Sequence, residues 1–392
     1  MYDFDRVVDR HGTNSLKWDF AVERGQAADA LPLWVADMDF PVAPCIQEAL
    51  QRVVSHGIFG YSDVKGDYYE AVAGWYEKRH QWRPAQEWLV KTPGVVCALA
   101  MAVQALTELG ESVLIQPPVY YPFYEVIRDN DRRIVISPLT LREGRYEIDF
   151  ADFERVIVES GARLFILCNP HNPVGRVWTQ EELQRLADIC LRHGVRVVSD
   201  EIHCDLILPG YEHQTLLRAA PELRDQVLIC TAASKSFNLA GLQVSNIWIP
   251  NPELRQAFVH RMNASGYSQL NPLGLAATKA AYLAGEEWLA ACQAYLTENL
   301  NFFRESLKKE LPQLQLIEPQ GTYFAWVDFR DTGLTGPEVN NLVSKKAKLW
   351  LDAGDLFGQE GAGFQRFVLA TQRETLAQAV SQLAAACRDR KD

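Results

Sequence analysis

The sequence predicts an α/β protein: a mostly parallel sheet covered by helices on both faces, beside a second, smaller α+β domain. Short apolar runs alternate with amphipathic helical stretches through the middle of the chain, which is typical of a sheet buried on both faces. The C-terminal part loses this alternation. The length of 392 residues, at about 150 residues per domain, suits two or three domains.

Six strands are expected in the central part of the chain. Each is a short β-branched or Leu-rich run bounded by Pro, Gly, Asp or Asn, and they span residues 112–116, 133–137, 163–168, 195–199, 226–231 and 244–249. Helices are expected between several of them, for example over 149–159 and 179–193. The second helix should begin with a capping box formed by Thr179 and Glu182.

The tail follows a different pattern. A long helix is expected over 288–311, strands over 321–329 and 364–370, and a last helix over 374–388. We expect this tail and the N-terminal arm to form the smaller domain. The predicted division is a large domain over 46–287 and a small, discontinuous domain over 1–45 and 288–392.

Composition and charge exclude several classes of protein. Acidic residues outnumber basic ones by 50 to 39, so we expect no nucleic-acid partner, which would normally require a basic face. No run approaches the ~18 apolar residues of a membrane span, and the mixed N-terminus has no apolar core typical of a signal peptide. The eight cysteines form no CxxC pair and lie mostly in apolar runs, so we expect a soluble, cytoplasmic protein.

Several common catalytic motifs are absent from the sequence. No GxGxxG follows a strand and no GxxxxGK[ST] occurs, which argues against dinucleotide and P-loop sites. HExxH and GxSxG are also missing, and the eight histidines are scattered. We therefore expect neither a zinc hydrolase nor any other metal site.

Polar motifs instead follow three expected strands at their C-terminal ends, where ligands bind in open α/β sheets. They span 169–175 (NPHNPVG), 199–203 (SDEIH) and 231–237 (TAASKSF). Taken singly, each has a structural explanation: a turn, an Asp that caps a helix, and a surface lysine. Together they supply a lysine for a Schiff base, an acid for a pyridine nitrogen and an amide for a phenolic oxygen. Those are the groups that pyridoxal 5'-phosphate (PLP) requires.

Three stretches carry a family resemblance that runs nearly end to end. They are 33–40 (LWVADMDF), 200–203 (DEIH) and 234–243 (SKSFNLAGLQ). The chain resembles the fold-type I PLP enzymes of the aminotransferase class I/II family, and more narrowly their cystathionine β-lyase branch (MalY/PatB-type C–S lyases). Ordinary aminotransferases usually have Tyr in place of His203 and Arg in place of Gln243. The resemblance implies a seven-stranded sheet in a three-layer, PLP-binding large domain.

The resemblance also implies roles for the cofactor-binding residues. Lys235 would form the Schiff base and act in catalysis, and Asp200 would pair with the pyridine nitrogen. Asn172 would bind the phenolic oxygen, with His203 nearby and Tyr120 stacked on the ring. The phosphate would lie at a helix N-terminus formed by Gly94, Val95 and Val96, with Ser234 as a further donor.

Two further residues would bind substrate or complete the site. Arg366, with Asn172, would hold the substrate α-carboxylate in a bidentate manner, although Arg373 could compete for that role. Tyr61, counted with Lys235 among the catalytic residues, would reach the phosphate of a neighbouring subunit, which implies a homodimer with shared active sites. The sequence departs from the family at Val368, where Asn is usual, and at Cys97, where Pro is usual.

The expected activity is β-elimination. L-cystathionine, or a related S-substituted cysteine, would give a thiol (homocysteine from cystathionine), pyruvate and ammonia. An aminotransferase that uses the same site is the nearest alternative. A regulatory binding protein that keeps the fold is a more distant one. The sequence does not identify the preferred sulfur amino acid.

Overall fold

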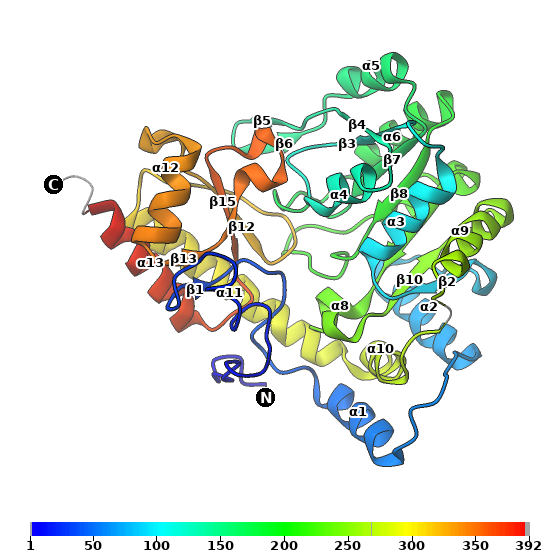
Figure 1. Ribbon diagram of the computed structural model, residues 1–392, viewed down its shortest axis with the longest axis horizontal. Helices are drawn as coiled ribbons and strands as arrows, with labels where there is room; N and C mark the ends of the chain where they lie inside the picture. Colours follow the sequence, from blue (N-terminus) through cyan, green and yellow to red (C-terminus); the bar gives the residue numbers. More distant parts are fainter. Residues whose placement is uncertain (1, 268, 389–392) are drawn as a thin grey trace.

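The computed structural model describes residues 2–267 and 269–388, and its centre is a sheet of seven strands (Figure 1). The strand order is β2-β10-β9-β8-β7-β3-β4. Neighbours from β9 to β4 are parallel, and β10 runs antiparallel to β9 and β2. This confirms the mostly parallel sheet. The bounds are β2 Leu89–Thr92, β3 Ser112–Ile115, β4 Arg133–Ile136, β7 Leu164–Cys168, β8 Arg196–Asp200, β9 Val227–Thr231 and β10 Ser245–Trp248.

All six expected strands are present, each within about two residues of its predicted ends. The sequence did not predict β2. This strand has only four residues, and its polar members Lys91 and Thr92 interrupt the apolar pattern. It pairs along the outer edge of β10, so tertiary pairing rather than local pattern makes it a strand.

Two apolar cores cover the two faces of this sheet, as expected for a three-layer arrangement. Successive residues of β7 alternate between them: Leu164 and Ile166 belong to one core, and Phe165 and Leu167 to the other. The first core is closed by α3 (Val95–Leu106), α4 (Pro122–Arg128) and α9 (Pro252–Ala264). The second is closed by α2 (Gly66–His80), α5 (Phe150–Ser160), α6 (Gln180–Arg192) and α10 (Pro272–Ala284).

The two helices predicted between the strands are confirmed, together with their caps. In α6, the Thr179 side chain accepts a hydrogen bond from the Glu182 amide, and the Glu182 carboxylate accepts one from the Thr179 amide. In α5, the Asp149 side chain caps the first turn. No helix among the described residues combines the length and the apolar character that crossing a membrane requires.

A smaller antiparallel sheet is formed by the tail, in the order β11-β12-β15-β14. Its strands are β11 Gln315–Ile317, β12 Phe324–Asp328, β15 Phe364–Val368 and β14 Asp352–Ala353, flanked by α11 (Glu286–Glu310), α12 (Gly336–Asn341) and α13 (Arg373–Arg388). The N-terminal arm joins this region, because β1 (Leu31–Pro32) pairs in parallel with β13 (Leu349–Trp350) (Figure 1). The domain boundaries at 45/46 and 287/288 stay a prediction.

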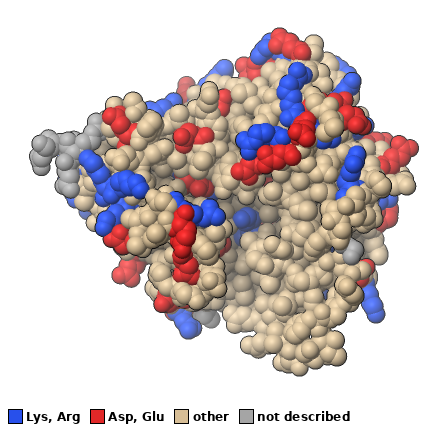
Figure 2. Space-filling model, in the orientation of Figure 1, with Lys and Arg blue, Asp and Glu red and all other residues tan. Residues whose placement is uncertain are grey.

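Charged side chains are unevenly spread over the surface. In Figure 2 the lower face, which α1 (Pro44–His56) and α10 occupy in Figure 1, carries few of them. Exposed apolar residues follow α1 in the chain: Ile58 is 71% exposed and Phe59 57%. The segment that leads from α1 to α2 therefore exposes apolar side chains to solvent.

The two sheets meet at the turn that follows β7. The carbonyl oxygen of Gly175 accepts hydrogen bonds from the amides of Gln320 (2.8 Å) and Gly321 (3.0 Å), which lead into β12. Gly175 has φ +72°, and a Cβ atom there would lie 2.6 Å from Cβ and 2.9 Å from Cα of Pro319. Glycine is therefore required both for the backbone conformation and for the close approach.

We expect Gly175→Ala to destabilise the protein by about 2 kcal/mol more than Gly210→Ala, because only the first substitution adds a clash to the backbone cost. Gly210 is the matched control: it has φ +92°, and nothing lies within 4 Å of the point that a Cβ atom would occupy there. Urea unfolding of both variants checks this. Equal losses of stability would contradict the close contact at Pro319.

Candidate functional site

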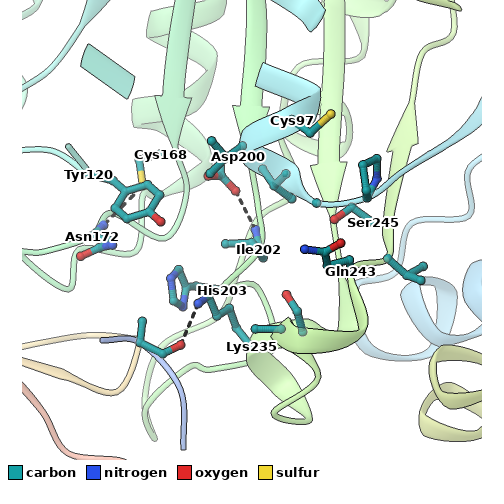
Figure 3. A pocket seen from close by; sticks show the side chains of 18 residues that line it. Cys97, Tyr120, Cys168, Asn172, Asp200, Ile202, His203, Lys235, Gln243 and Ser245 are labelled. Atoms are coloured by element: carbon teal, nitrogen blue, oxygen red, sulfur yellow. Dashed lines mark hydrogen bonds between the residues drawn. The ribbon is translucent and has the colours of Figure 1, made fainter. Parts of the chain in front are cut away.

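The carboxyl ends of β7, β8 and β9 open into one cavity of about 220 Å³ (Figure 3). Nine residues that the resemblance assigns to the site line it: Gly94, Val95, Val96, Tyr120, Asn172, Asp200, His203, Ser234 and Lys235. Parallel strands place their carboxyl ends at one edge of the sheet, which brings together motifs that lie about 30 residues apart in the chain. Arg366 lies beside the cavity, and Tyr61 does not line it.

Asp200, the last residue of β8, is buried and lines the cavity. One of its oxygens accepts a hydrogen bond from the amide of Ile202 at 3.1 Å. Burial raises the pKa of Asp200 to about 7. No lysine or arginine among the described residues forms an ion pair with it. A cation entering the cavity would keep this carboxylate ionised.

Lys235 lies across the open space from Asp200, in the short helix α8 (Ala233–Ser236) (Figure 3). Its Nζ donates a hydrogen bond to the carbonyl of Ala36 at 2.7 Å. Burial, with a contribution from the Arg366 charge, lowers the pKa of Lys235 to about 8. The lysine is thus tuned toward a neutral, nucleophilic amine.

A buried carboxylate holds α8 in place. The Ser236 hydroxyl donates to Asp205 at 2.7 Å, and Trp75 and His80 of α2 also bond to this carboxylate. Although burial alone would raise it, the pKa of Asp205 falls to about 2 because of the hydrogen bond and charge of His80 and the Arg79 charge. Asp205 belongs to the loop that follows β8, so it ties the helix of Lys235 to the loop that begins directly after Asp200.

Asn172 connects the cavity to Arg366. Its Oδ1 accepts a hydrogen bond from Nη1 of Arg366 at 2.9 Å, so an amide faces the cavity next to a buried guanidinium. The ring of Tyr120 flanks the same space (Figure 3). Arg373, the competing candidate, instead pairs with Glu298 and lies over Tyr295, so the structure does not bring it to the cavity.

His203 lies in the wall of the cavity beside aromatic side chains. Its ring packs in a T-shaped arrangement against the rings of Tyr323 and Phe324, with centroids 5.9 and 5.3 Å apart. Burial lowers the pKa of His203, so the ring is neutral. Its buried Nδ1 has no hydrogen-bond partner among the described residues, which leaves it available to a ligand.

One part of the cavity lining is suited to an anion. Helix α3 starts there at Val95, and no side chain caps its first turn, so the amide N–H groups of that turn are available. Ser234, Ser245 and Gln243, which carry hydroxyl and amide groups, also line the cavity. Cys97 lies in the first turn of α3, and the helix begins normally despite the absence of proline.

Tyr61 is 97% exposed, on the segment between α1 and α2. Within one chain it therefore contacts none of the residues above. Its expected role depends on a second subunit.

Sequence reasoning missed four residues that shape the site: Ala36, Cys168, Ser245 and Asp352. Ala36 lies within the recognised stretch 33–40, and Cys168 and Ser245 lie at strand ends, so position could have suggested these three. The sequence around Asp352 contains no pattern that points to a role in the site. It is paired with Arg366 only through the register of two neighbouring strands.

These groups fit PLP. The Asp200 carboxylate could pair with a protonated pyridine nitrogen, and the Lys235 amine could form a Schiff base with the aldehyde of PLP. Asn172 and Tyr120 line the same cavity and would bind the phenolic oxygen and the ring, and the uncapped start of α3 suits the phosphate. The buried Asp200 carboxylate is the strongest sign, because it has no cationic partner of its own among the described residues.

Comparisons with known proteins support PLP as the cofactor. Residues 28–383 match the model of the family described as aminotransferase class I and II. The chain is similar to cystathionine beta-lyase PatB of Bacillus subtilis, with 42% identity over 98% of this chain and 99% of that protein. Among solved structures, it is similar to cystalysin of Treponema denticola, which contains PLP (TM-score 0.96, 34% identity, 99% of each chain). It is also similar to the PLP-bound C–S lyase of Staphylococcus hominis (TM-score 0.92, 34% identity, 98% of each chain).

The raised pKa of Asp200 predicts a pH effect on the cofactor-free protein. Because its folded-state pKa of about 7 exceeds the ordinary 3.8, the folded state keeps a proton that the unfolded state has released. Stability is therefore lost as pH rises toward 7. The unfolding free energy of wild type relative to Asp200→Asn should fall by about 2 kcal/mol between pH 5 and 7, then level off above pH 8. Urea unfolding across this range checks it, and a pH-independent difference would contradict the raised pKa of Asp200.

Proposed function

This chain belongs to the aminotransferase class I and II family, and we propose that it is a PLP-dependent carbon–sulfur β-lyase. Its substrate would be L-cystathionine or a related S-substituted cysteine. With cystathionine and water, the products are homocysteine, pyruvate and ammonia. The observation that carries the proposal is the full-length similarity to a cystathionine β-lyase, in a chain whose Lys235 and Asp200 face one cavity.

The residues at the sheet edge support this chemistry. When bound, PLP supplies an electron sink for the negative charge that develops at the substrate Cα. Asp200 holds a proton on the pyridine nitrogen, since a buried carboxylate favours a cation beside it. Lys235, whose pKa is lowered to about 8, is the group that removes the Cα proton, and loss of the β-thiolate follows.

Arg366 and Asn172 are the proposed substrate-binding residues. The guanidinium is buried and held by Asn172 and the carbonyl of Trp34 at 2.9 and 2.8 Å. Its Nε has no partner among the described residues, so this donor is left for the α-carboxylate. The amino acid would then be fixed with its Cα near Lys235.

A homodimer with shared active sites is part of the proposal. Tyr61, Ile58 and Phe59 expose large apolar side chains on the segment between α1 and α2, and such side chains are typical of a protein interface. Tyr61 would reach the phosphate in the partner's cavity. The proposed compartment is the cytoplasm, because all eight cysteines are free thiols.

The proposal predicts equal release of thiol and pyruvate from L-cystathionine by the PLP-loaded protein, without any added keto acid. Lys235→Ala should lower this rate by about 1,000-fold or more, because it loses both the base and the cofactor link. Lys78→Ala is the control: this lysine is exposed and pairs with Glu286 on the surface. Keto-acid-dependent amino transfer without thiol release would contradict the lyase and favour an aminotransferase.

Shared active sites predict complementation between two inactive variants. In an equal mixture of Tyr61→Ala and Lys235→Ala, half the dimers should be mixed, and each carries one intact site and one doubly damaged site. The mixture should recover about a quarter of wild-type activity if the subunits exchange at random. Mixing after brief dissociation and reassociation tests this. Activity no higher than the sum of the separate variants would contradict a site that Tyr61 completes from the partner.

A further inference from the structure

A second buried carboxylate, Asp352, lies directly beside Arg366. Asp352 of β14 is the cross-strand partner of Arg366 of β15 in the antiparallel pairing. The two residues are 4% and 2% exposed. The Asp352 carboxylate accepts a hydrogen bond from Nη2 of Arg366, and this ion pair is the only one that either residue forms among the described residues.

The remaining contacts fix the guanidinium from several sides. Nη1 donates to Asn172 and Nη2 also donates to the Trp34 carbonyl. The rings of Phe324 and Phe357 lie 4.3 and 4.9 Å from the guanidinium carbon. Nε alone is buried without a partner among the described residues. The group is thus held from several sides, and Nε remains free to donate to a ligand.

We propose that Asp352 is the positioning residue of the substrate-carboxylate subsite: it orients Arg366 through Nη2 and its charge weakens the binding of the substrate α-carboxylate. This inference rests on the proposed role of Arg366. It also explains how the chain tolerates Val368 at the position where the family usually has a supporting Asn. Arg366 is supported instead by Asp352 of β14, the strand that neighbours β15.

The effect on affinity follows from two anions sharing one buried cation. The α-carboxylate would bind the guanidinium that already neutralises Asp352, and like charges a few ångströms apart in a buried site repel each other. Burial raises the pKa of Asp352, which is consistent with a carboxylate that is only partly compensated. Removing this charge while keeping the oxygen acceptor should therefore strengthen carboxylate binding.

The test compares two ligands on the PLP-loaded protein, by titrating the change in visible absorbance of the bound cofactor. L-alanine has the α-carboxylate and L-alaninamide lacks it, and neither has a sulfur leaving group. In Asp352→Asn, we expect L-alanine to bind about tenfold more tightly while L-alaninamide binds as in wild type. In Asp352→Ala, which also loses the acceptor that orients Arg366, L-alanine should bind several-fold less tightly than in Asp352→Asn.

Asp328→Asn is the matched control, because Asp328 is a buried carboxylate of the same sheet that pairs with Arg330 rather than Arg366. It should leave both affinities unchanged. If Asp352→Asn does not fold, Asp352→Ser supplies a second neutral acceptor with the same expected direction. Equal shifts for both ligands, or no shift for L-alanine, would overturn the proposal. Because the ligands carry no thiol, this outcome is independent of whether cystathionine is cleaved.

Discussion

Asp200 and Lys235 are two groups of opposite charge that face one cavity without pairing with each other. Each would be stabilised by a direct ion pair, yet among the described residues the side chain of Asp200 bonds only to a backbone amide and that of Lys235 only to a backbone carbonyl. Burying a charged group without an ion pair costs free energy. Burial therefore raises the pKa of Asp200 and lowers the pKa of Lys235, because it disfavours the charged form of each. A ligand with a cationic nitrogen at one end and an aldehyde at the other relieves both. The remaining parts of the site are arranged around this requirement.

The sheet and its supports hold the two groups apart. Strands β8 and β9 are adjacent and parallel, so the residues that follow them open at the same edge. Asp205 then joins the loop after β8 to α8 through Ser236, and to α2 through Trp75 and His80. On the substrate side, Arg366 is fixed by groups from the N-terminal arm, the turn after β7 and the smaller sheet. The site therefore depends on the contact between the two sheets.

Much of this could be predicted from the sequence, and the exceptions have a common cause. The strands, the capping box of α6 and the three strand-end motifs are local patterns, so they can be recognised without knowing the fold. The pairing of β2, the carbonyl of Ala36 on Lys235 and the ion pair of Asp352 are not local. They depend on strand register and on how the arm packs, which a single sequence does not reveal. Tyr61 is an intermediate case, because the family resemblance assigned it a role that one chain cannot fulfil.

The most direct test of the central claim is to locate the covalent link between the cofactor and the protein. The protein is loaded with PLP, reduced with borohydride and digested, and the labelled peptide is identified by mass spectrometry. We expect one label per chain, on Lys235, and a weaker loading in Asp200→Asn. A label on another lysine, or no label at all, would contradict the proposed cofactor site.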